Sequence, residues 1–180
     1  MELLETMLKR KSIRMYNEKP VTKDLLDEIL TAGLLAPSSR NFLPVEFIRI
    51  TDKDMLMDLS RAKNAGADML TEASAAIVVI ADHEKSDVWV EDAAIAMIYM
   101  QLRATDLGIG NCWVQCRNRT SKAKGSDGEK LSSEAYVKKL LQIPDQYSVL
   151  SILSLGMTDA IPEGRKAEDV DFKKVHKNEF

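Results

Sequence analysis

Hydrophobic residues recur along the first part of the chain at spacings that predict two helices and a strand. Leucines, with a methionine or an isoleucine, lie three or four residues apart over 2–9 and over 22–34, which is the spacing of one helical face. Thr22 can cap the second helix, and the Ala36-Pro37 pair ends it because proline disfavours helix in the residue before it. Alternating apolar and polar residues then predict a strand over 45–51.

The middle of the chain has the pattern of a buried centre. Residues 54–73 have helical spacing, interrupted near Gly66. Residues 75–81 (AAIVVIA) are continuously apolar and include β-branched side chains, which is typical of a central strand covered on both faces. Residues 91–107 are apolar nearly all round, so we expect a buried helix that forms the spine of the domain.

The following part of the chain predicts two further strands and one helix. A short strand is expected over 111–115 and another over 149–155, and Ser132 or Ser133 can cap a helix between them. Residues 117–133 are polar and rich in Gly, Ser and Lys. We expect this segment to be a mobile insert, either a lid or a disordered stretch.

The last segment, 160–180, is polar but carries four spaced apolar residues, Val170, Phe172, Val175 and Phe180. Because a single small domain has little spare apolar surface, these side chains need a surface to pack on. A partner subunit and the chain's own domain are both open as that surface from composition alone. No repeat or linker divides the chain, so the sequence predicts a single domain over 1–180.

Overall charge gives no indication of a nucleic acid or a membrane as partner. The chain has 25 basic and 28 acidic residues and a net charge of −3, so any anion site must be a local cluster. The longest apolar run, 93–102, is far short of the ~20 residues that span a bilayer. Residues 1–14 place their cations after the apolar stretch, the reverse of a secretory leader, and we expect a cytoplasmic protein.

Cysteine and histidine usage predicts neither a disulfide framework nor a metal site. The only cysteines are Cys112 and Cys116, and the two histidines, His83 and His176, lie far apart in the sequence.

A cluster of three cations and a hydroxyl occupies five consecutive residues, Arg10-Lys11-Ser12-Ile13-Arg14. If this segment is extended, Arg10, Ser12 and Arg14 share one side. Two guanidinium forks and a hydroxyl suit a phosphate and the polar chain attached to it. The alternative is a solvated basic patch.

A second cluster lies in the predicted loop 36–44, Ala-Pro-Ser-Ser-Arg-Asn-Phe-Leu-Pro, between a helix and a strand. Asn41 offers two donors and an acceptor, which suit the edge of a heterocycle. An ordinary turn rich in turn-forming residues is the alternative.

These two clusters, in this order, resemble the nitroreductase family of FMN-dependent oxidoreductases. Further matching motifs are Glu91-Asp92-Ala93-Ala94, the segment from Leu107 to Val114 (LGIGNCWV), Ile143-Pro144, Leu155-Gly156 and Arg165-Lys166. The resemblance covers residues 8 to 178. A dinucleotide-binding reading of Gly108-Ile109-Gly110 fails, because these glycines follow a predicted helix instead of a strand and lack the third glycine.

The resemblance implies an α+β fold with a central, mostly antiparallel sheet flanked by helices, in an intertwined homodimer whose C-terminal segment wraps the partner. It also implies FMN as the cofactor. In this chain the implied contacts to the phosphate and ribityl chain are Arg10 and Ser12, within the basic motif that includes Lys11. Arg165, with Lys166, closes on the phosphate.

The same resemblance implies the contacts to the flavin ring. Arg14 lies toward the pyrimidine edge as an electrostatic tuner, and Asn41 hydrogen-bonds that edge. Pro37, Ser38 and Ser39 come from the other subunit, and backbone amides around Gln115 and Cys116 face N5 and O4. No protein acid or base is implied, because the cofactor carries the chemistry.

The implied activity is transfer of hydride from NAD(P)H through FMN to a nitroaromatic, quinone or enone, in a ping-pong scheme. A flavin storage or sensor protein with little turnover is the alternative. Reductive dehalogenation, flavin fragmentation and a module without flavin are further readings. Leu43 stands where many members have Gln, Val45 where many have Trp, and Cys116 where many have Gly, so the sequence leaves the acceptor open.

The Arg14→Glu variant tests the implied role of Arg14. A cation near N1 and O2 stabilises the anionic reduced flavin, so this variant is expected to bind FMN more weakly and to lower the flavin potential. Losing one charge-assisted hydrogen bond, worth ~1.5–3 kcal/mol, weakens binding by roughly tenfold or more. Fluorescence titration and a spectroelectrochemical potential are the measurements, and unchanged values for both would remove Arg14 from this role.

Overall fold

The computed structural model describes residues 2–125, 128–160 and 163–180. The fold is α+β, as expected, and is built from five α-helices and six strands within those residues. In chain order these elements are α1 Leu3–Lys9, α2 Lys23–Leu34, β1 Val45–Ile50, α3 Lys53–Leu59, β2 Ala75–Asp82, α4 Trp89–Asp106, β3 Gly110–Gln115, β4 Thr120–Lys124, β5 Lys130–Ser132, α5 Ser133–Leu141 and β6 Tyr147–Gly156.

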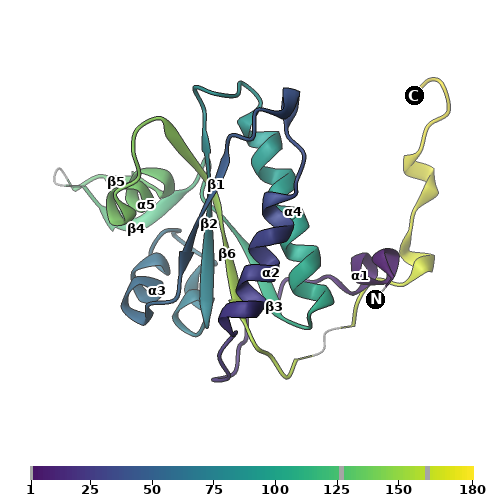
Figure 1. Cartoon of the computed structure of the whole chain (residues 1–180), viewed down its shortest axis with the longest axis horizontal. Coiled ribbons are helices and arrows are strands. Elements are labelled where there is room, and N and C mark those ends of the chain that lie inside the picture. The colour runs from purple at the N-terminus through teal and green to yellow at the C-terminus, as the bar shows by residue number, and fades with distance from the viewer. Residues whose placement is uncertain (1, 126–127, 161–162) are drawn as a thin grey trace.

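A four-stranded antiparallel sheet with the order β1-β2-β6-β3 forms the middle layer. Helices α2 and α4 cover one face, and α3 and α5 lie on the other (Figure 1). Strand β2 pairs with β1 on one side and β6 on the other, and its residues 75–81 are buried. The predicted central strand is therefore confirmed.

Alternation along β2 explains why the domain has a core on each side of the sheet. Ala76, Val78 and Ile80 belong to the core under α3 and α5, and Ile77 and Val79 belong to the core under α2 and α4. Side chains of consecutive strand residues point to opposite faces, so one apolar run supplies both cores.

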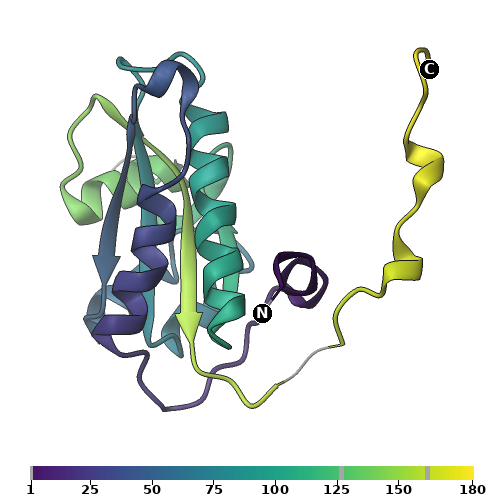
Figure 2. The ribbon, with the colours of Figure 1, turned by 45° about the vertical axis from the view of Figure 1, so that its right-hand side comes forward.

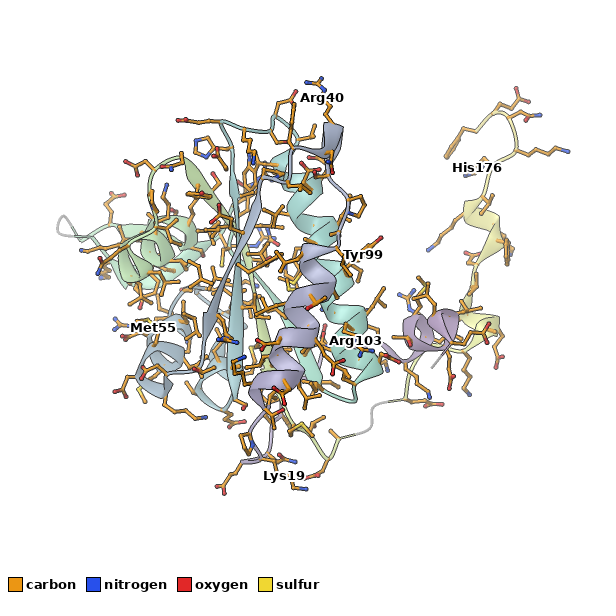
Figure 3. The ribbon with its side chains drawn as sticks, viewed as in Figure 1. Lys19, Arg40, Met55, Tyr99, Arg103 and His176 are labelled. Carbon is orange, nitrogen blue, oxygen red and sulfur yellow. The ribbon has the colours of Figure 1, made fainter. Side chains whose placement is uncertain are left out.

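Helix α4 is the predicted spine, but one of its faces is uncovered. Ala93, Met97, Met100 and Ala104 lie in the core against the sheet. Three other apolar residues, Ile95, Ile98 and Tyr99, are exposed. Figure 3 shows Tyr99 on the side of α4 that faces α1 and the tail.

The predicted capping residues of two helices are confirmed, whereas the helix predicted over 54–73 is shorter than expected. The Thr22 side chain accepts a hydrogen bond from the Leu25 amide at the start of α2, and the Ser132 side chain accepts one from the Ala135 amide at the start of α5. The predicted helix over 54–73 ends at Leu59 instead, and only a short 3-10 turn, Asp68–Thr71, follows.

The expectation of a disordered stretch over 117–133 is corrected for its described residues, which contain the β4–β5 hairpin. This hairpin is tied to the domain because the Asn64 amide donates to the Thr120 carbonyl and the Lys122 amide donates to the Arg61 carbonyl. Residues 126 and 127 lie outside the described residues. The lid role of the segment remains a prediction.

The tail touches the end of α1 through Gly164 and Arg165, and beyond these residues it runs clear of the sheet and its helices in both views (Figures 1 and 2). Residues 165–180 are exposed throughout, including Phe172 at 77% and Phe180 at 104%. In this structure the apolar residues of the tail therefore do not pack on the chain's own domain. Residues 161 and 162 of the expected wrapping segment lie outside the described residues. Among the described helices, none is long and apolar enough to cross a membrane.

Candidate functional site

The basic segment 10–14 runs extended along the free edge of β3. The Ile13 amide donates to the Asn111 carbonyl at 2.9 Å. Lys9, Lys11 and Ile13 line a pocket of about 370 Å³ beside the 108–111 turn, and side chains alternate along extended backbone. Arg10, Ser12 and Arg14 therefore share the other side, as predicted, and Lys11 is separated from them.

The C-terminal segment joins this basic segment directly. The Arg165 amide donates to the Leu8 carbonyl at 2.8 Å, and Gly164 lies so close that an added Cβ would be 2.5 Å from that same oxygen. We call Arg10, Ser12, Arg14 and Arg165 the basic half-site. None of its three arginines has an acidic partner among the described residues.

Lys166 does not join the basic half-site in the same way. Its ammonium group lies 3.4 Å from a carboxylate oxygen of Glu163, and both side chains are exposed. Because the pair is exposed, it is weak and exchangeable.

Tyr16 fixes the segment that carries the basic half-site. Its hydroxyl lies 2.7 Å from Ser154 Oγ and 3.0 Å from the Ile13 carbonyl oxygen. Its ring packs so closely on Gly156 that an added Cβ there would come within 2.4 Å. Burial raises the pKa of the Tyr16 hydroxyl well above its usual value. The hydroxyl therefore stays neutral and acts as a hydrogen-bonding anchor.

The loop 37–44 is fixed to α4 by a buried carboxylate. Asp92, in the first turn of α4, accepts hydrogen bonds from the Ser39 amide at 2.8 Å and from Ser86 Oγ at 2.9 Å. The Ser38 side chain accepts a hydrogen bond from the Leu43 amide at 2.8 Å. These contacts stabilise a loop in which three non-glycine residues have left-handed backbone, namely Arg40, Asn41 and Leu43.

The far end of β3 lies at the same end of the domain as this loop. The Arg117 guanidinium is 5.9 Å from the centroid of the Trp89 ring, and Trp89 opens α4 one turn before Asp92. We call Pro37, Ser38, Ser39, Asn41 and Gln115 the loop half-site.

The structure corrects the expectation for Cys116. Its amide already donates to the Leu150 carbonyl at 3.1 Å, so it is not free to face a flavin. Its side chain belongs to the core on the α3 and α5 side, and burial raises the pKa of the thiol to about 12. The side chain of Gln115 is also engaged, because its Nε2 donates to the Arg117 carbonyl and its Oε1 accepts from Trp113.

The two half-sites lie at opposite ends of α4. The loop is bonded to Asp92, whereas Asn111, which receives the Ile13 amide, is bonded to Thr105. These two α4 residues are thirteen positions apart, which is roughly 20 Å at about 1.5 Å per residue. In Figure 3 Arg40 marks the loop end, and Arg103 lies on the half of α4 near α1.

This separation corrects one implied assignment. Asn41 lies in the same loop as Pro37, Ser38 and Ser39, so it belongs with them on one subunit. Arg14 and Asn41 of the same chain are too far apart to meet at one pyrimidine edge.

Sequence reasoning missed the residues that hold the two half-sites in place. Asp92 appeared only as a member of the motif at residues 91–94, and Tyr16 appeared in no motif. Their roles depend on contacts with residues that lie 53 and 138 positions away in the chain. Arg117 was not singled out because it begins a polar segment that was interpreted as a mobile insert. Within the described part of the chain, no group of three His, Cys, Asp or Glu residues is placed to hold a metal ion.

Comparisons with known proteins agree with this architecture. The model of the nitroreductase family matches residues 7–85 and 55–157. A putative NADH dehydrogenase/NAD(P)H nitroreductase of Archaeoglobus fulgidus is 36% identical over 172 residues, which cover 93% of this chain and 92% of the relative. The chain therefore belongs to the nitroreductase family, and the resemblance seen in the sequence is confirmed.

Solved structures of the family share the fold. An FMN-dependent nitroreductase from Clostridium difficile superimposes with a TM-score of 0.90 at 43% identity, covering 98% of this chain and 99% of that one. The NADPH:FMN oxidoreductase of Vibrio harveyi in complex with NAD+ gives a TM-score of 0.81 at 25% identity, covering 99% of this chain and 77% of that one. The predicted nitroreductase-like fold is therefore confirmed.

The Gly156→Ala variant tests the anchoring of the basic segment. The new Cβ would overlap the Tyr16 ring, so we expect the ring to move and the protein to lose about 1–3 kcal/mol of unfolding free energy. Hydrogen exchange at the Ile13 and Asn17 amides, which bond to Asn111 and Met157, should accelerate.

Gly33→Ala is the matched control. Its Cβ would come within 2.9 Å of Met100 Cγ and of Phe47 Cζ, which do not contact the basic segment. Equal acceleration at Ile13 in both variants would contradict the anchoring role of Tyr16.

Proposed function

We propose that this protein is an FMN-dependent oxidoreductase that passes hydride from NAD(P)H to a small nitroaromatic, quinone or enone in a ping-pong scheme. The observation that carries the proposal is the basic half-site, in which the backbone of Arg165 is bonded beside the segment that carries Arg10 and Arg14, and none of these arginines has an acidic partner among the described residues. The names of its relatives, among them an NADPH-flavin oxidoreductase of Vibrio harveyi and an FMN reductase of Bacillus subtilis, support the cofactor and the reductant.

The chemistry of the basic half-site fits the phosphate end of FMN. Arg10 and Arg165 offer guanidinium forks that match phosphate oxygens two at a time, and Arg14 follows them toward the ring. The exposed Ser12 hydroxyl adds a donor for the ribityl chain. Lys11 lies on the opposite side of the segment and Lys166 is paired with Glu163, so both act as peripheral charges at most.

The loop half-site suits the ring end of the cofactor. Pro37 and Asn41 are exposed, and the Asn41 amide can pair with a heterocycle edge. The backbone around Gln115 lies on β3, the strand at the edge of the sheet, whose outer side is paired with no other strand. Because this half-site lies roughly 20 Å from the basic half-site, each complete site takes one half from each of two chains.

A homodimer also explains the exposed apolar face of the domain. Leu3 and Met7 on α1, at 61% and 48% exposure, lie beside Tyr99 in a pocket of about 420 Å³. Leu4, Ile95 and Ile98 extend this surface. The apolar residues of the tail need a surface of the same kind, and wrapping over a second copy supplies it.

The residues of the two half-sites can bind FMN and place charge near it, but they supply no group for proton transfer. Bound FMN supplies hydride acceptance at N5 and release of the electrons to the acceptor. Arg14 provides positive charge toward the pyrimidine edge, where reduction adds negative charge. Tyr16 and Cys116 stay neutral because burial raises the pKa of both groups, so neither supplies a proton at neutral pH.

The purified protein tests this function directly. We expect a flavin absorption spectrum, bleaching by NADH or NADPH, and steady turnover with menadione or a nitrofuran. A coloured protein that is bleached but turns over slowly with every acceptor would favour flavin storage or sensing. A colourless protein that takes up no FMN would end the proposal.

Mixed dimers test the sharing of the site between two chains. Arg10→Glu damages the basic half-site and Asn41→Asp damages the loop half-site, and each homodimer is expected to lose most of its FMN. A heterodimer of the two variants then contains one intact site and one doubly damaged site. We expect tandem-tag purified heterodimer to regain about half of the wild-type FMN content, because the lesions segregate.

The opposite arrangement gives a different result. If each site came from a single chain, both sites of the heterodimer would carry one lesion, and the FMN content would stay at the level of the damaged homodimers.

A further inference from the structure

Arg117 is a half-buried cation at the ring end of the proposed site. Its guanidinium lies over the Trp89 ring, 5.9 Å from the centroid. No acidic side chain among the described residues pairs with it. Its backbone amide donates to the Leu150 carbonyl at 3.0 Å, so the start of the side chain is fixed on the sheet.

The turn that presents Arg117 is closed on both sides. The Arg119 amide donates to the Cys116 carbonyl at 3.0 Å, and Asn118 takes the left-handed conformation, with φ of 58°, that asparagine tolerates well. The Gln115 side chain donates to the Arg117 carbonyl at 3.1 Å. A cation on a turn held at several points loses little conformational entropy when it binds an anion.

The phosphate of FMN is not the anion that Arg117 can bind. That phosphate belongs at the basic half-site, whereas Arg117 lies against the first turn of α4 at the loop end. Arg40 stands at the same end, stacked 5.8 Å from the Phe42 centroid and equally without an acidic partner among the described residues. The nearby carboxylate of Asp92 is already engaged by two donors.

A second anion does come to the ring end during the proposed reaction. The nicotinamide must lie against the flavin ring to deliver hydride, and the pyrophosphate of NAD(P)H is attached to it through one ribose. We propose that Arg117, with Arg40 as a second cation at the same end of α4, binds the phosphate groups of NAD(P)H. This inference rests on the proposed function and adds the binding site for the reductant.

The Arg117→Ala variant tests the inference when two hydride donors are compared. NADH carries the pyrophosphate, whereas 1-benzyl-1,4-dihydronicotinamide has the same reactive ring with no phosphate and no charge. In anaerobic stopped-flow reduction of the FMN-loaded variant, we expect the dissociation constant for NADH to rise about tenfold, the size of one lost charge-assisted hydrogen bond. The rate with the benzyl compound should stay at its wild-type value.

Two further variants separate charge from structure. Arg117→Lys keeps a point charge and should restore part of the NADH affinity. Arg61→Ala removes an exposed arginine on the other face of the sheet and should leave both donors unchanged. The salt dependence of NADH binding should weaken in Arg117→Ala and persist in Arg61→Ala.

Two results would overturn the inference while leaving the proposed function intact. One is an equal loss of rate with both donors, which would mean that Arg117 acts on the flavin or on the fold. The other is unchanged binding of NADH. A wild-type protein that holds no FMN would instead overturn the function itself, and absorption spectra taken before mixing distinguish these cases.

Discussion

The length of α4 sets the geometry of everything else in this protein. Its eighteen residues run the full height of the sheet, with the loop 37–44 bonded to its first turn and the basic segment bonded beside its last. A rigid element of this kind fixes two chemically different surfaces at a distance that no side chain can bridge. Its exposed apolar residues Ile95, Ile98 and Tyr99 lie between them along the helix. The same helix thus sets the distance between the two half-sites and supplies an apolar surface on which a second chain can pack.

Much of the fold could be predicted because the signals were local. The spacing of apolar residues, the helix caps and the proline that ends a helix are all set by residues close together in the sequence. The sequence therefore predicted α2, β2, α4 and α5 close to their observed bounds. The β4–β5 hairpin was missed because its short strands are polar on their outer side and carry lysines and serines that also suit a solvated loop. Its stability comes from bonds to Arg61 and Asn64, which are distant in sequence.

The composition of the site could be predicted, but its geometry could not. Motif order identified the basic and loop residues together, and it gave no distance between them. That distance depends on how α4 packs against the sheet. The direction of Cys116 also depends on register, because one step along β3 moves a side chain from the face covered by α3 and α5 to the face covered by α4. Strand register is set by long-range pairing with β6.

The backbone of the loop 37–44 is not the most stable one available. Arg40, Asn41 and Leu43 all have φ near +50°, a region that costs a non-glycine residue of order 1 kcal/mol or more. Glycine would relieve that cost at each position, yet none of the three is glycine. Asp92 and Ser38 hold the shape by hydrogen bonds instead. The loop therefore lowers the stability of the folded protein but holds side chains in one defined conformation. Such a loss of stability is expected where a loop binds a ligand.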